Sequence, residues 1–199
     1  MKIVVISGVP GTGKTTLANL LSSKLDGMVI SLGEFVRERD LGEEWDADRQ
    51  TLIVDEGRAR NALMKEIERL ASDITGWLII EGLFCDVVAD AADFAIVLRL
   101  HPRELRRRLR ERGYGTAKVQ ENVQAEILGT CTFHMREAIG TGFMDIDTTN
   151  LDPSEIVEII LAVLEGRTSS GRHAPGKVNW LQDPGIDPLA HFGTGGSGA

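Results

Sequence analysis

Short runs of consecutive apolar residues recur along the chain, separated by longer segments with helical spacing. Four runs stand out and a fifth is weaker: residues 2–7 (KIVVIS), 28–32 (MVISL), 77–81 (WLIIE), 94–100 (FAIVLRL) and 143–147 (FMDID). Their apolar residues are continuous instead of alternating, which is typical of strands covered on both faces of a parallel sheet. The pattern therefore predicts a buried parallel β-sheet.

Four segments place apolar residues three and four positions apart, as amphipathic helices do. They are residues 15–25, 56–71, 102–112 and 153–166. The last has the clearest ends, because Asp152 and Glu155 form a capping-box pair at its start and Gly166 stops it. Strands alternating with such helices predict βαβ units in a doubly wound α/β fold, which binds ligands beyond the carboxyl ends of its strands.

Composition and charge restrict the class of protein. The chain has 199 residues, enough for one well-buried α/β domain. Its 22 basic and 30 acidic residues give a net charge of −8, which argues against broad electrostatic binding to DNA or RNA. The first apolar run is too short for a signal peptide, and no run approaches the ~18 apolar residues of a membrane span. We expect a cytoplasmic protein that binds neither nucleic acid nor membrane.

Cysteines and histidines offer no metal or redox motif. Cys85 and Cys131 lie far apart without CxxC spacing, so we expect two reduced thiols buried as small hydrophobes. The histidines match no zinc-binding spacing: His101, His134, His173 and His191.

A glycine-rich segment follows the first predicted strand and opens the first predicted helix. Residues 6–17, ISGVPGTGKTTL, contain the G-x-x-x-x-G-K-T spacing of a loop that wraps nucleotide phosphates. Gly8, Gly11 and Gly13 let the backbone take positive φ and approach an anion closely. The successive N–H groups then form an anion-binding concavity at the positive end of the helix.

Three side chains of this loop complete a nucleotide site. Lys14 is expected to reach the β- and γ-phosphates, Thr15 to ligate Mg²⁺, and Thr16 to donate near the α-phosphate. Glu81, at the end of a buried strand, is a candidate to orient Mg²⁺ or its water. The alternative for Glu81 is an acid that faces solvent at a strand end.

The class of phosphate-loop protein is narrowed by what the sequence lacks. It has no Asn-Lys-x-Asp tetrapeptide, which guanine-specific switches use to read their base. Large motors and helicases need more chain for their further nucleotide-facing elements. The small-kinase class remains.

Two stretches carry a resemblance to a known family. The phosphate loop with Pro10, together with the chain length, resembles nucleoside monophosphate kinases. Residues 30–56 and 111–127 closely resemble adenylate kinase isoenzyme 6. That family, found in archaea and eukaryotes, is also described as an ATPase acting in small ribosomal subunit maturation. The resemblance covers residues 1–165 and implies a three-layer P-loop NTPase domain over that range. Its five-stranded parallel sheet would have the order 2-3-1-4-5.

The resemblance also implies roles for particular residues. ATP would be bound by Gly11, Gly13, Lys14, Thr15, Thr16 and Arg112. Residues 31–54 match a short monophosphate-binding segment in which Arg37 is a phosphate ligand, and residues 111–121 match a short lid. Asp147, Thr148 and Thr149 match a turn that the family places near adenine, although a turn-and-cap role is equally consistent with composition.

The implied activity is transfer of the ATP γ-phosphoryl group to AMP, giving two ADP, with Mg²⁺ as cofactor. Lys14, Glu81 and Arg112 would be the catalytic residues, with Thr15 and Glu81 at the metal. The family's partner is a platform protein of the small ribosomal subunit. Leu83 stands where the family usually has a histidine linked to ATP hydrolysis, which predicts a weakened ATPase.

Two alternatives remain open. One is a non-kinase assembly ATPase whose nucleotide cycle gates docking to a ribosomal protein. The other is a P-loop kinase for another small molecule.

The predicted helix 102–112 carries six arginines: Arg103, Arg106, Arg107, Arg108, Arg110 and Arg112. Glu104 pairs naturally with Arg108, and Glu111 with Arg107, at helical spacing. A solvated helix face is therefore the default for most of them. Arg112, just before Gly113, is the arginine expected to contact the nucleotide.

The composition changes at Gly166. Residues 166–199 hold 8 of the 22 glycines and 3 of the 6 prolines without periodicity, which predicts a flexible extension. Trp180, Leu181 and Phe192 support the alternative that this tail docks on the domain or on a partner.

Overall fold

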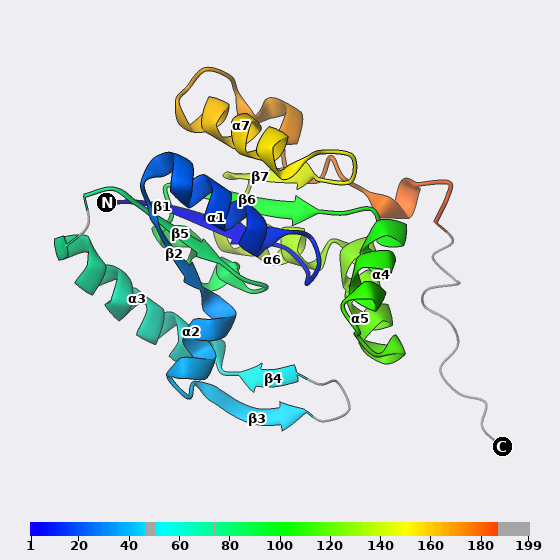
Figure 1. Cartoon of the computed structure of the whole chain (residues 1–199), viewed down its shortest axis with the longest axis horizontal. Helices are drawn as coiled ribbons and strands as arrows, with labels where there is room; N and C mark the ends of the chain where they lie inside the picture. Colours follow the sequence, from blue (N-terminus) through cyan, green and yellow to red (C-terminus); the bar gives the residue numbers. More distant parts are fainter. Residues whose placement is uncertain (47–50, 74, 187–199) are drawn as a thin grey trace.

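A five-stranded parallel sheet lies at the centre of the chain, in the order β2-β5-β1-β6-β7 (Figure 1). The computed structural model describes residues 1–46, 51–73 and 75–186. The strands of the sheet are β1 (Lys2–Ser7), β2 (Met28–Ser31), β5 (Trp77–Glu81), β6 (Phe94–Arg99) and β7 (Phe143–Asp147). All five predicted strands are confirmed. Counted among themselves they have the predicted order 2-3-1-4-5, and the labels differ only because β3 and β4 belong to a separate hairpin.

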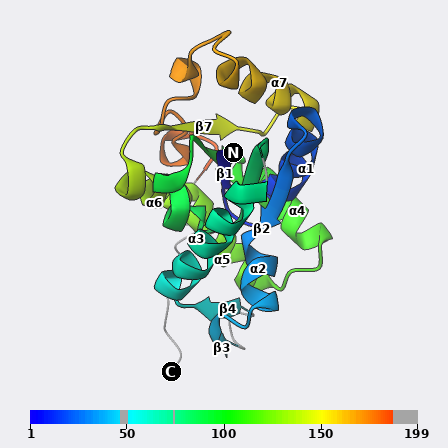
Figure 2. The same ribbon diagram turned by 90° about the vertical axis from the view of Figure 1, so that its left-hand side faces the viewer.

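Helices cover both faces of this sheet, as the continuous apolar runs predict. Figure 2 shows α1 (Lys14–Leu25) and α7 (Pro153–Leu164) on one face, with α3 (Glu56–Asp73) and α6 (Thr130–Ile139) on the other. Within β1, Val4 and Ile6 pack in the α1–α7 core and Ile3 and Val5 in the other. The strand is apolar throughout because alternate side chains enter two different cores.

The ends of α7 follow the sequence prediction. Asp152 and Glu155 form the reciprocal capping box, and Gly166 takes a left-handed φ of 71° just after the helix. One apolar position of α1 does not follow its pattern, since Leu20 is exposed while Leu17 and Leu21 are buried.

Two further groups of elements stand at the carboxyl end of the sheet. The first is a helical hairpin of α4 (Pro102–Glu111) and α5 (Thr116–Leu128), and the predicted lid 111–121 is its turn together with the start of α5. The second combines α2 (Leu32–Glu38) with the antiparallel strands β3 (Gly42–Asp46) and β4 (Thr51–Val54), which form the predicted segment 31–54. Residues 47–50 of that segment lie outside the described residues. A short 3₁₀ helix, η1 (Cys85–Ala91), follows β5.

The expected flexible extension from residue 166 is wrong for its first part. Residues 167–186, called here the C-terminal strap, contain two 3₁₀ turns, η2 (Ser170–His173) and η3 (Trp180–Gln182), and run from α7 past β7 toward α4 (Figure 1). Trp180 and Ile186 are buried, so the docking alternative holds for Trp180. Leu181 remains 47% exposed, and Phe192 lies outside the described residues.

The strap is held by a buried charged cluster. Arg99, at the end of β6, donates to the Glu126 carboxylate on α5 at 2.8 Å and to the Val178 carbonyl of the strap at 3.2 Å. The Trp180 indole N–H donates to the same Glu126 carboxylate at 2.8 Å. Asp145 on β7 lies 3.6 Å from the Arg99 guanidinium. Composition cannot predict such an arrangement, because the partners are far apart in sequence.

Among the helices of the described ranges, none combines the length and apolar content needed to cross a bilayer.

Candidate functional site

The phosphate loop joins β1 to α1 at the carboxyl end of the central strand. Gly8, Gly11 and Gly13 have φ values of 147°, 94° and 99°, the positive region that side chains rarely tolerate. A Cβ at Gly8 would also lie 2.7 Å from the Leu98 carbonyl oxygen, and one at Gly11 would lie 2.9 Å from Leu105. The loop therefore requires glycine both for its backbone conformation and for its close contact with β6 and α4.

Lys14 is the first residue of α1 and lies over this loop. Its ammonium donates to the Val9 carbonyl oxygen at 3.1 Å, so the side chain folds back across the loop. Burial lowers the pKa of Lys14, and the nearby Cys131 and Glu81 partly oppose that shift. An ammonium that is poorly solvated and held by a carbonyl gains strongly from a phosphate oxygen.

Thr15 and Glu81 meet beside the lysine. The Thr15 hydroxyl donates to the Glu81 carboxylate at 3.1 Å, and Glu81 is only 4% exposed at the end of β5. The solvent-facing alternative for Glu81 is therefore wrong. A hydroxyl and a carboxylate are the hard oxygen donors that Mg²⁺ takes, usually together with phosphate oxygens. Within the described ranges no three His, Cys, Asp or Glu side chains gather to hold a metal by themselves.

One cavity of about 270 Å³ joins most of the predicted site residues. It is lined by Gly11, Gly13, Lys14, Thr15, Thr16, Glu81 and Arg112, together with Pro10, Ser31, Gly33, Gly82, Leu83 and Phe84. We call it the phosphate cavity. Ser31 and Gly33 belong to the predicted segment 31–54, whereas Gly82 and Phe84 were not predicted as site residues. The rule that ligands bind beyond the carboxyl ends of strands could have found Gly82 and Phe84, because they follow β5.

Arg37 is the one predicted ligand outside this cavity. It is exposed on α2, and its guanidinium donates to the Gly33 carbonyl oxygen at 3.2 Å. Gly33 lines the phosphate cavity, so Arg37 lies one helical turn from it without lining it.

The arginines of α4 divide as the spacing predicts. Arg107 contacts Glu104 and Glu111, and Arg108 contacts Glu104 at 2.8 Å. Arg112 caps the end of α4 and lines the phosphate cavity instead. The left-handed Gly113, with φ of 78°, follows it and turns the chain toward α5.

A second chamber of about 490 Å³ adjoins the phosphate cavity and shares Pro10, Leu83 and Phe84 with it. We call it the side chamber. Its further walls come from β4, α3, η1, the turn before α5, and the helices α5 and α6. They include Val54, Glu56, Asp86, Tyr114, Lys118, Asn122 and His134. Apolar and polar side chains line this chamber in nearly equal numbers. Leu83 is 46% exposed between the two spaces, and its carbonyl accepts from Ser7 at 2.9 Å.

The two cysteines are buried in the core, and the turn after β7 is fixed by hydrogen bonds within the chain. Cys85 and Cys131 are both free and buried, and burial raises the pKa of Cys131 to about 12. The Asp147 carboxylate accepts from the Thr149 amide at 2.9 Å, and Thr148 donates to the Arg99 carbonyl at 2.9 Å. The turn thus has its own cap and is fixed to β6.

Comparison with known proteins agrees with this geometry. Residues 4–129 match the family model described as "AAA domain". A protein of Saccharolobus islandicus named "Putative adenylate kinase" is 35% identical over 181 residues, covering 91% of this chain and 88% of the relative. A protein of the same name from Pyrococcus abyssi is 35% identical over 182 residues, covering 90% and 92%.

Solved structures share the fold at low sequence identity. Shikimate kinase from Bacteroides thetaiotaomicron has a TM-score of 0.57 at 19% identity, over 82% of this chain and 98% of that one. Thymidylate kinase from Candida albicans has a TM-score of 0.53 at 15% identity, over 83% and 92%. The architecture is therefore that of small P-loop kinases.

Proposed function

Because the chain belongs to this AAA-domain family of adenylate kinase homologues, we propose that it transfers the γ-phosphoryl group of ATP to AMP, forming two ADP. The observation that carries the proposal is the phosphate cavity, where Lys14, Glu81 and Arg112 converge beside an adjoining side chamber. The first space suits a triphosphate tail, and the second suits an acceptor nucleoside.

The residues present act mainly by positioning and by positive charge, which is what phosphoryl transfer requires. Lys14 exchanges the Val9 carbonyl for phosphate oxygens, and Arg112 supplies a second cation from α4. The amides of the loop and the amino end of α1 hold the phosphates without a side-chain rearrangement. Apolar walls at Phe84 and Val54 fit the base of the acceptor.

Mg²⁺ fits the donor set beside the lysine. The Thr15 hydroxyl and the buried Glu81 carboxylate would hold the ion or its waters, while the nucleotide supplies the remaining oxygens. When bound, the ion neutralises charge on the β- and γ-phosphates. Arg37, one helical turn from the cavity, is proposed to swing toward the acceptor phosphate once that phosphate is present.

Within the family we propose the isoenzyme 6 branch, on the strength of residues 30–56 and 111–127. A role in small ribosomal subunit maturation, with a platform protein as partner in the cytoplasm, belongs to that proposal. Leu83 supports transfer over hydrolysis, because it offers no imidazole where water would be activated.

The experiment is to incubate the full chain with ATP and Mg²⁺ plus each nucleoside monophosphate separately. ADP formation that depends on AMP, at two ADP per AMP consumed, is expected. Lys14→Ala controls for the phosphate loop, and phosphate release without AMP measures hydrolysis. If no monophosphate is phosphorylated, the kinase proposal fails. Phosphate release alone would then favour the assembly ATPase, and turnover with a hydroxyl acceptor would favour another small-molecule kinase.

A further inference from the structure

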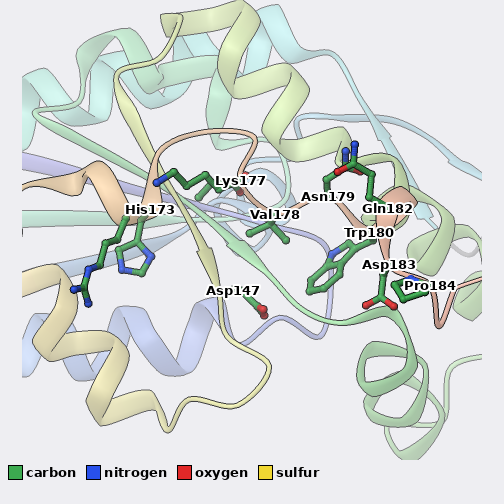
Figure 3. A pocket seen from close by; sticks show the side chains of 11 residues that line it. Asp147, His173, Lys177, Val178, Asn179, Trp180, Gln182, Asp183 and Pro184 are labelled. Carbon is green, nitrogen blue, oxygen red and sulfur yellow. The ribbon is translucent and has the colours of Figure 1, made fainter.

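A cavity of about 480 Å³ lies where the C-terminal strap passes the end of β7 (Figure 3). It shares no lining residue with the phosphate cavity or the side chamber. We call it the strap cavity. Asp147 projects into it from β7, while His173, Lys177 and Asp183 reach it from the strap. Its volume is in the range of small-molecule sites.

The carboxylates of the strap cavity already have partners within the chain. The heavy-atom distances are between 2.7 and 3.3 Å. The pairs are Asp145 with Thr132 and Gly176, Asp147 with Thr149, and Asp183 with His101 and Gly185. Asp145 also faces the Arg99 guanidinium at 3.6 Å. These acids are therefore satisfied by hydrogen bonds or cations that belong to the fold.

The basic side chains of the same cavity have no such compensation. Within the described part of the chain, neither Arg172 nor Lys177 forms an ion pair, and Lys177 donates only to the uncharged Gly171 carbonyl, at 2.6 Å. His173 is half-buried between them. Burial lowers the pKa of His173, and the charges of Arg172 and Lys177 lower it further. An anion at this wall would reverse that effect.

We propose that the strap cavity binds a small phosphate-bearing anion at the wall formed by Arg172, His173 and Lys177. A guanidinium offers a donor fork to phosphate oxygens, and an ammonium adds a compact charge. Protonated His173 supplies a third donor from inside the cavity. Free phosphate and the phosphate group of a nucleotide share this chemistry. Asn179 and Gln182 line the remaining space, which leaves room for a polar group beyond the phosphate.

The test follows the His173 imidazole by NMR in the full chain carrying Lys14→Ala, which weakens binding at the phosphate loop. The resonance is assigned by its loss in His173→Gln. Inorganic phosphate is titrated at constant ionic strength against chloride, and free imidazole added to the same sample serves as the reference. We expect phosphate to raise the pKa of His173 by about one unit, equivalent to tenfold tighter binding to the protonated form.

The matched variant is Arg172→Gln with Lys177→Gln, two exposed positions whose replacement leaves the packed part of the strap intact. It should abolish the response to phosphate. An equal response to chloride would mean charge screening only and would overturn the proposal, as would a response that persists in the double variant. AMP and adenosine distinguish the sources. A response to AMP but not adenosine identifies a nucleotide phosphate, a response to phosphate alone identifies the free ion, and a response to adenosine contradicts an anion site.

Discussion

Two cations of the described residues, the buried Arg99 and the half-buried Lys14, differ in how far the protein itself supplies their hydrogen-bond partners. The Arg99 side chain is 2% exposed and donates to Glu126, Thr132 and Val178, with Asp145 also close. Its guanidinium fork is saturated by the protein itself. The Lys14 ammonium has one protein oxygen, at Val9, and its pKa is lowered by burial. One charge is used for cohesion and the other is left ready for a ligand.

The difference follows from the chemistry of the two side chains. A guanidinium has five donors in a rigid plane, so it can join several elements at once. An ammonium is a compact charge on a flexible stem, and it can exchange one oxygen for another without moving the backbone. Arg99 is thus a fixed junction between several elements, whereas Lys14 is an adaptable group that can bind a ligand.

The largest expected effect on stability comes from replacing Arg99. Arg99→Met would leave Glu126 and Asp145 buried without their cation, and the free energy of unfolding should fall by about 3–5 kcal/mol. Urea unfolding measures it. Arg107→Met on the exposed face of α4 is the control, with a loss below about 1 kcal/mol. Equal losses in the two variants would contradict the special position of Arg99.

Replacing Lys14 should lower activity without lowering stability. Lys14→Ala is expected to lower the rate of phosphoryl transfer by about 10²–10³, the effect of deleting one preorganised charge donor. The free energy of unfolding should stay equal or rise, because a poorly solvated charge is removed. Steady-state kinetics and urea unfolding give the two quantities.

Lys24→Ala, an exposed lysine of the same helix, is the matched control and should leave both quantities nearly unchanged. If Lys14→Ala loses as much stability as Arg99→Met, the contrast between Lys14 and Arg99 is contradicted.

A smaller effect is expected at the strap's own contribution to the Arg99 cluster. Trp180→Phe keeps the buried ring but removes the N–H that donates to Glu126, so the free energy of unfolding should fall by about 1.5–3 kcal/mol. Leu181→Ala, at the exposed neighbour, should change it by less than about 0.5 kcal/mol. If the two variants are alike, the strap does not complete the cluster.

The smallest effect on stability is expected at the exposed arginines of α4, which differ from both Arg99 and Lys14. The hydrogen bond from Arg107, aided by Arg108, lowers the pKa of Glu104 from 4.5 to about 2. This stabilisation is complete above pH 4.5 and is lost as the pH falls toward 2. Because the pair is near solvent, it amounts to less than about 1 kcal/mol.

Unfolding of Glu104→Gln at pH 6 and pH 2.5 measures this term. Its difference from the unaltered chain should shrink toward zero at the lower pH. A difference that grows on acidification would reverse the assigned sign.

Local signals in the sequence predict most of the fold and the residues of the phosphate loop. The five strands are continuous apolar runs, and the phosphate loop lies within one motif, so Lys14 and Thr15 follow from neighbouring residues. The Arg99 cluster carries no such signal. Arg99 looks like a charged strand end, and its partners Glu126 and Val178 are 27 and 79 residues away.

The strap was predicted only as an alternative, from its Trp180, and its contacts could not be read from the sequence for the same reason. Its glycines and prolines remove periodicity, and its long-range hydrogen bonds are made by Gly176, Val178, Trp180 and Gly185. Arg37 shows the opposite limit, because a family pattern marks the residue while its side chain lies outside the phosphate cavity in the structure.

The contact between Trp180 and Glu126 also bears on the moment at which the protein matures on the ribosome. Translation produces the phosphate loop first and residue 180 after every other member of the Arg99 cluster. A nascent polypeptide that has reached residue 165 owns a complete nucleotide loop, yet Glu126 still lacks its indole donor. The phosphate-binding loop is therefore synthesised early, whereas the last hydrogen bond to Glu126 forms only after the 3₁₀ turn of the strap has been made.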